Sequence, residues 1–76
     1  MAKVDIVKTA FTEVLAGAGF AISDADAEYA FGDEQPAVNS GFAVPPNGQV
    51  NGIEGKKLWA RSTNFDSSKV YAEVWA

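Results

Sequence analysis

The side chains best suited to acid–base chemistry in this sequence gather in the stretch DADAE, where Asp24, Asp26 and Glu28 alternate with alanines. Two carboxyl groups can act as general acid and general base, and several together can bind Ca²⁺. Read as an EF-hand loop that starts at Asp24, the stretch has Tyr29 where glycine is needed and Gln35 where glutamate is needed. We therefore expect a solvated turn that leads into a strand, with an irregular cation site as the alternative.

Nucleophilic catalysis has few candidate residues. The sequence contains no histidine and no cysteine, which removes the commonest general base, the thiol nucleophile, the commonest metal ligands and any disulfide. Ser67, Ser68 and Lys69 are adjacent, but Ser–Lys catalysis requires a fixed geometry that a polar loop rarely supplies. We expect a protein that is not an enzyme, uses no cofactor, and has no catalytic, cofactor-binding or metal-binding residue.

The length and composition indicate one small folded domain. The chain has 76 residues, of which 47% are hydrophobic and 21% charged, as in ordinary globular domains. A domain of this size buries a modest share of its surface, so it usually depends on disulfides, a metal or a partner subunit. Because the first two are excluded or unsupported, we expect a homo-oligomer. No apolar run reaches the roughly 20 residues of a membrane span, and the N-terminus lacks a signal-peptide pattern, so no membrane association is expected.

The charged residues are unevenly distributed along the chain. Seven acids and no base lie between Thr9 and Gly55, whereas four bases and two acids follow from Lys56 onwards, and the net charge is −4. Nucleic-acid binding needs a concentrated basic surface, so we do not expect it. A basic segment on an acidic body would suit contact with another copy or a complementary surface; the alternative is scatter in a short sequence.

Short runs with alternating side chains predict strands through most of the sequence. Turn-forming residues separate them, most clearly in PPNG at 45–48. A closing hairpin is predicted from the last two runs, joined by the turn-rich segment STNFDSS at 62–68. The predicted strands fall within residues 19–23, 27–32, 40–45, 48–53, 56–62 and 69–76.

The N-terminal stretch allows two interpretations. Its apolar residues lie at helical spacing, but it is rich in valine, isoleucine and threonine, which favour strands. We predict an all-β fold, a small antiparallel β-sandwich or barrel-like domain of about 6–8 short strands. In it, residues 1–9 form an N-terminal arm or first strand, and residues 10–76 a single β-sandwich domain. The alternative is an α+β fold with an N-terminal helix over residues 3–16.

The predicted hairpin has one small-residue face and one aromatic, charged face. We expect the small face to point into the core: Leu58, Ala60, Val70, Ala72 and Val74. The other face would then carry a predicted interface: Trp59, Arg61, Tyr71, Glu73 and Trp75. Exposed contiguous aromatic surface usually marks a contact site, with another subunit or with a sugar. The alternatives are that the aromatic side chains form the core, or that the N-terminal segment packs over Trp59.

Most of the chain resembles small virion structural proteins of tailed bacteriophages. The resemblance runs through FTEVLAGAGFAIS, AEYAFGDEQP, SGFAVPPNGQV and the closing KKLWARS…KVYAEVW, from about Ala10 to Trp75. Its motifs are turns and alternating strands without a catalytic signature, so no functional residue carries over.

This resemblance implies a capsid decoration or cement protein that stabilises the phage head. Such modules are commonly compact β-sandwiches grouped around a symmetry axis, so it implies a homotrimer bound to the major capsid protein. The location would be the capsid surface of the virion, after synthesis in the host cytoplasm. The alternative is a receptor- or carbohydrate-binding module of a phage fibre or tail.

Overall fold

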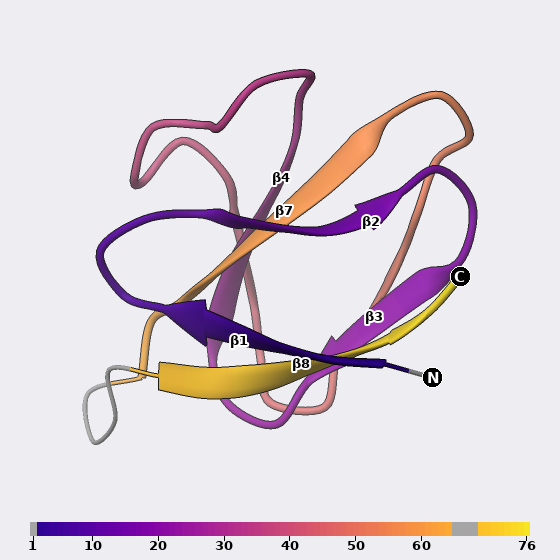
Figure 1. Ribbon diagram of the computed structural model, residues 1–76. Helices are drawn as coiled ribbons and strands as arrows, with labels where there is room; N and C mark the ends of the chain where they lie inside the picture. Colours follow the sequence, from indigo (N-terminus) through magenta and orange to yellow (C-terminus); the bar gives the residue numbers. More distant parts are fainter. Residues whose placement is uncertain (1, 65–68) are drawn as a thin grey trace.

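The computed structural model describes residues 2–64 and 69–76 (Figure 1). Its regular elements are all strands, and no helix occurs in this part of the chain. The strands are β1 (Ala2–Val7), β2 (Thr12–Ala16), β3 (Phe20–Ser23), β4 (Ala27–Phe31), β5 (Phe42–Val44), β6 (Gln49–Asn51), β7 (Lys57–Ser62) and β8 (Lys69–Trp75).

These strands form a sandwich of two antiparallel sheets. Sheet A has the order β1-β8-β3-β6 and sheet B the order β2-β7-β4-β5. The chain crosses between the sheets at every connection except the one from β4 to β5. The predicted all-β sandwich is therefore confirmed, and the number of strands lies at the top of the expected range.

The alternative with a helix over residues 3–16 is wrong. This segment divides into β1, which pairs with β8 in sheet A, and β2, which pairs with β7 in sheet B. The β-branched residues that count against a helix lie on pleated strands, where they pack well. Of the two options for residues 1–9, the described residues 2–7 form a first strand.

The core lies between the sheets and is built from the small-residue faces. Along β7 and β8, the residues expected to point inward are all buried in one hydrophobic cluster: Leu58, Ala60, Val70, Ala72 and Val74. Tyr29 and Leu58 are among its largest fully buried side chains. The alternative in which the hairpin aromatics form this core is therefore wrong.

The hairpin predicted from β7 and β8 is not formed. β7 lies between β2 and β4 in sheet B, whereas β8 lies between β1 and β3 in sheet A. The two strands face each other across the core instead of pairing side by side. Residues 65–68 of the predicted hairpin loop lie outside the described residues.

The turn predicted at PPNG has the expected chemistry. Asn47 adopts a positive φ of 64°, which asparagine tolerates better than most residues. The Gly48 N–H donates to the Pro45 carbonyl at 3.1 Å, and the Asn47 N–H donates to the Ser23 carbonyl at 2.8 Å. This turn carries the chain from β5 in sheet B to β6 in sheet A.

Candidate functional site

The five residues predicted to form one interface lie on opposite sides of the sandwich. Trp59 and Arg61 project from the outer face of sheet B, because their neighbours on β7 point into the core. Tyr71, Glu73 and Trp75 project from the outer face of sheet A by the same alternation along β8. The prediction of a single shared face is wrong, since it depended on the hairpin. Each outer face has to be considered separately.

The outer face of sheet B is covered by the chain itself around Trp59 and Arg61, whereas Glu13 and Lys57 on the same face are exposed. The connection of residues 32–41, between β4 and β5, folds back over it. At one end, the Trp59 Nε1–H donates to the Gly32 carbonyl at 2.8 Å. Within the connection, the Gln35 side-chain amide donates to the Phe11 carbonyl, also at 2.8 Å. Trp59 is therefore a partly buried side chain that ties this connection to its sheet.

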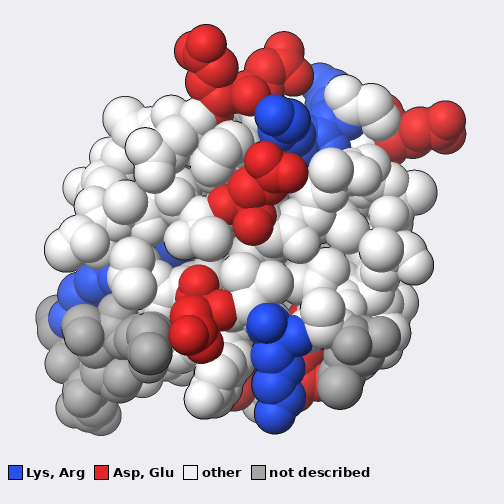
Figure 2. Space-filling model, viewed as in Figure 1, with Lys and Arg blue, Asp and Glu red and all other residues white. Residues whose placement is uncertain are grey.

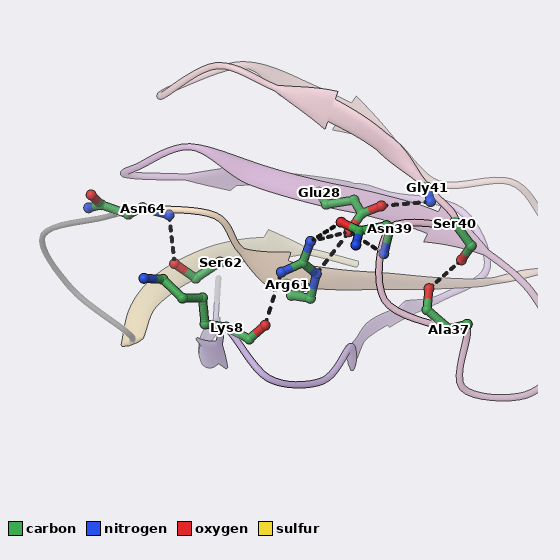
Figure 3. Close-up of polar contacts among 9 residues, drawn as sticks. All are labelled: Lys8, Glu28, Ala37, Asn39, Ser40, Gly41, Arg61, Ser62 and Asn64. Atoms are coloured by element: carbon green, nitrogen blue, oxygen red, sulfur yellow. Dashed lines mark hydrogen bonds and ion pairs between the residues drawn. The ribbon is translucent and has the colours of Figure 1, made fainter.

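A buried ion pair on sheet B also holds this connection in place (Figure 3). The Glu28 carboxylate on β4 accepts from Arg61 Nε at 2.8 Å, and Arg61 Nη2 lies 2.6 Å from the same oxygen. Both side chains are more than nine-tenths buried. Glu28 also accepts from the Gly41 N–H at 2.8 Å and the Asn39 N–H at 3.2 Å. The guanidinium donates in addition to the Lys8 carbonyl and to Asn39 Oδ1, at 2.9 and 3.2 Å.

The hydrogen bonds that Glu28 accepts together lower its pKa more than its burial raises it. Burial alone would raise the pKa of this carboxyl, but the Gly41 N–H, the Arg61 guanidinium and the Asn39 N–H together hold its pKa below the usual range. Glu28 is thus a buried, charged residue that accepts from internal donors on both of its carboxylate oxygens. This arrangement is typical of a structural ion pair.

The three acidic residues considered for cation binding do not lie in one environment, because Glu28 pairs with Arg61. Asp24 and Asp26 are exposed, whereas Glu28 is buried against Arg61. Among the described residues, no three acidic side chains lie close enough to hold a metal ion. Of the Ser67–Lys69 stretch, the two serines and the side chain of Lys69 lie outside the described part.

The segment between β1 and β2 also covers sheet B. Phe11 is 2% exposed, yet it is not part of the cluster between the sheets. Its ring centroid lies 6.0 Å from the Arg61 guanidinium carbon, a cation–π distance. This segment therefore packs over β7 at Arg61, whereas the alternative interpretation predicted the contact at Trp59.

The outer face of sheet A carries aromatic residues on its two central strands. Phe20 on β3 lies opposite Trp75 on β8, and their rings stack with centroids 4.7 Å apart and 16° between their planes. Tyr71 is 49% exposed, and Lys3 Nζ lies 5.4 Å from the centroid of its ring. We call this set the aromatic face: Lys3, Phe20, Tyr71, Glu73 and Trp75.

Polar side chains continue this face towards the β6 edge. Asn51 lies opposite Phe20, and Gln49 lies opposite Ile22, in the register of β3 and β6. The Gln49 amide donates to Asn51 Oδ1 at 2.8 Å. Aromatic rings and amide groups thus lie side by side, which suits contact with a surface that is partly apolar and partly polar.

Phe20 and Lys3 belong to the aromatic face but were not among the predicted interface residues. The signal that identifies Phe20 is the alternation in FAIS, because the buried Ala21 and Ser23 place Phe20 and Ile22 on the opposite side. No comparable signal identifies Lys3, since its place beside Tyr71 depends on the pairing of β1 with β8.

The separation of charge along the sequence does not persist in space. Arg61 pairs with Glu28, and Lys57 Nζ lies 3.9 Å from Glu13, so two bases of the C-terminal segment meet acids of the acidic stretch. On the face drawn in Figure 2, the described acidic and basic side chains lie in small groups separated by uncharged surface. No helix in the described part is long and apolar enough to cross a membrane.

No family model, curated protein or solved structure matches this chain.

Proposed function

We propose that this protein is a non-enzymatic virion structural protein that decorates and cements the head of a tailed bacteriophage. The observation that carries the proposal is the contrast between the two outer faces. Residues 32–41 cover sheet B around Trp59 and Arg61, where a buried ion pair holds them, whereas sheet A carries the exposed Tyr71 beside the half-buried, stacked rings of Phe20 and Trp75. Exposed aromatic surface on a small domain is typical of a contact site.

In this proposal the aromatic face docks onto the major capsid protein. Trp and Tyr supply large contact areas with a polar tip, and both are enriched where interfaces carry most of their binding energy. Lys3 and Glu73 give the same face charges of both signs, which can set orientation. Many copies on one particle repeat each contact, so a modest contact per copy can stabilise a whole head.

The predicted homotrimer stays a prediction. The family resemblance implies it, but the single face through which copies were expected to associate is not formed, because Trp59 and Trp75 lie on opposite sides of the sandwich. Sister copies and the major capsid protein remain the proposed partners. The proposed location is the capsid surface, after synthesis in the host cytoplasm.

The test uses particles of the phage that carries this gene. We expect the protein to co-purify at hundreds of copies per head, and gene deletion to leave heads that rupture more readily on heating or osmotic shock. Complementation with Tyr71→Ala should reduce the bound copies, because Tyr71 is the most exposed aromatic residue of the face. Complementation with Lys56→Ala, at an exposed residue outside this face, should not. Heads of unchanged composition and resistance after deletion would exclude a cement role.

A specific observation favours a second candidate, a receptor- or carbohydrate-binding module of a fibre or tail. The stacked Phe20–Trp75 pair lies in register with Asn51, which is hydrogen-bonded to Gln49. Rings for stacking beside amides for hydrogen bonding are what a sugar-binding surface needs. The copy number separates the candidates, because a fibre or tail part would be present at a few to tens of copies per particle.

A further inference from the structure

The sandwich has four edge strands, and β1 is the one suited to accept another strand. β1 pairs with β8 over six consecutive positions without a register shift. The edge strand β2 contains a register shift between Glu13 and Leu15, and the edge strands β5 and β6 span three residues each. Short or irregular edges resist strand addition, whereas a long regular edge offers unpaired N–H and C=O groups. No described strand pairs with the other side of β1.

The charges on β1 are self-complementary. Lys3 and Asp5 flank Val4 and lie on the outer side of sheet A, opposite Glu73 and Tyr71 of β8. In an antiparallel pair of β1 strands centred on Val4, each Lys3 lies opposite Asp5 of the second copy. The neighbouring registers that keep the same side chains on the outer face are centred on Lys3 or on Asp5. They place Lys3 opposite Lys3 of the second copy, or Asp5 opposite Asp5 of the second copy.

Charged residues on an edge strand often prevent pairing. Here the two charges have opposite signs and are spaced two positions apart, so they disfavour the registers centred on Lys3 or Asp5 and favour the one centred on Val4. The pattern therefore specifies one arrangement instead of blocking all of them.

We propose that two copies of this chain associate through their β1 edges, antiparallel and centred on Val4, about a two-fold axis perpendicular to sheet A. The two copies of sheet A would form one continuous sheet in which both β1 strands are central. Directly opposite residues in an antiparallel pair point to the same side, so both aromatic faces would lie on one side of the dimer. This inference stands on the β1 edge and not on the capsid role, so either can fail alone.

The experiment is light scattering on the full chain over a range of concentrations. We expect a mass approaching twice the 8.0 kDa of the chain. Lys3→Asp and Asp5→Lys each place like charges opposite one another twice per dimer, so each should weaken dimerisation at least about tenfold. An equimolar mixture of these two variants restores opposite charges at both positions and should form a heterodimer. The combined variant K3D/D5K should dimerise like the original chain.

Matched controls separate pairing from net charge and from folding. Lys56→Asp and Glu54→Lys make the same changes of charge in the exposed connection between β6 and β7 and should leave the dimer unchanged. Circular dichroism should show each variant folded. A monomer at all concentrations, a mass of three chains, or a dimer that persists in both single variants would overturn the proposal. So would a mixture of the single variants that remains monomeric.

Discussion

Replacing Glu28 with glutamine should remove much of the stability of this small domain. The carboxylate is buried and accepts hydrogen bonds from Arg61, Asn39 and Gly41. Glutamine keeps the shape and one acceptor oxygen, but its amide nitrogen would meet donors and the Arg61 charge would lose its counter-ion. A buried charge without a partner costs more than the pair contributes when intact.

The expected magnitude lies between two limits. Breaking a fully buried pair costs about 3–5 kcal/mol, whereas an exposed pair contributes roughly 0–1 kcal/mol. The Glu28–Arg61 pair is buried, but it is covered by one layer of chain, so we expect a loss of about 2–4 kcal/mol. Domains of this length have a total stability of about 4–11 kcal/mol. The melting temperature should therefore fall by about 10–30 °C.

Urea unfolding of Glu28→Gln, Arg61→Met and the double variant measures the pair directly. The double-mutant cycle should give a coupling free energy of at least about 1.5 kcal/mol. The pH dependence has a fixed sign, because the pKa of Glu28 is lowered from its ordinary value of 4.5 by folding. Its contribution is present above about pH 4.5 and is lost as the pH falls through the lowered pKa. The difference between the original chain and Glu28→Gln should shrink in acid accordingly.

An exposed pair on the same sheet provides the control. Glu13 lies 3.9 Å from Lys57, and both side chains are more than one-third exposed. Glu13→Gln should cost less than about 0.5 kcal/mol. Equal losses for Glu28→Gln and Glu13→Gln, or a coupling below about 0.5 kcal/mol, would show that the Glu28–Arg61 pair behaves as an exposed one.

Two further predictions concern residues around the same strands. Gly41→Ala should destabilise the protein by at least about 2 kcal/mol, because an added Cβ would overlap the Tyr29 carbonyl. Gly32→Ala is the control, because the atom nearest to its added Cβ would lie 3.3 Å away. In urea unfolding it should cost less than about 1 kcal/mol. Tyr29→Phe should change the stability by less than about 1 kcal/mol, because the buried Tyr29 hydroxyl forms no well-formed hydrogen bond among the described residues and has only a weak contact with the Ser23 side chain. A thermal-melt loss corresponding to more than about 1 kcal/mol for Tyr29→Phe would contradict that assignment.

The period of two along the last two strands predicted their inward faces correctly. Alternation in KVYAEVW places Val70, Ala72 and Val74 on one side, and these residues are buried. Such a pattern depends only on the pleat of one strand. It is therefore readable from the sequence before any partner of the strand is known.

Strand pairing could not be predicted in the same way. β7 and β8 both direct small residues towards one core. The same alternating pattern would result if the two strands paired in one sheet or faced each other across the core. The turn-rich segment between them suits a hairpin as well as a crossing between sheets. The assignment of Trp59 and Trp75 to one face therefore failed. The ion pair of Glu28 and Arg61 was also missed, because their side chains meet only once β4 lies beside β7.

The cover on the outer face of sheet B comes mainly from the connection between β4 and β5. Residues 32–41 form the longest connection between described strands, and hydrogen bonds to Trp59 and Glu28 hold them on sheet B. The shorter segment 8–11 adds Phe11 to this cover, whereas 17–19, 24–26 and 45–48 are connections of three or four residues that pass from one sheet to the other. Aromatic residues consequently have different roles on the two sides. Trp59 fixes a covering segment and serves stability, whereas Tyr71 remains at the surface on which the proposed contact depends.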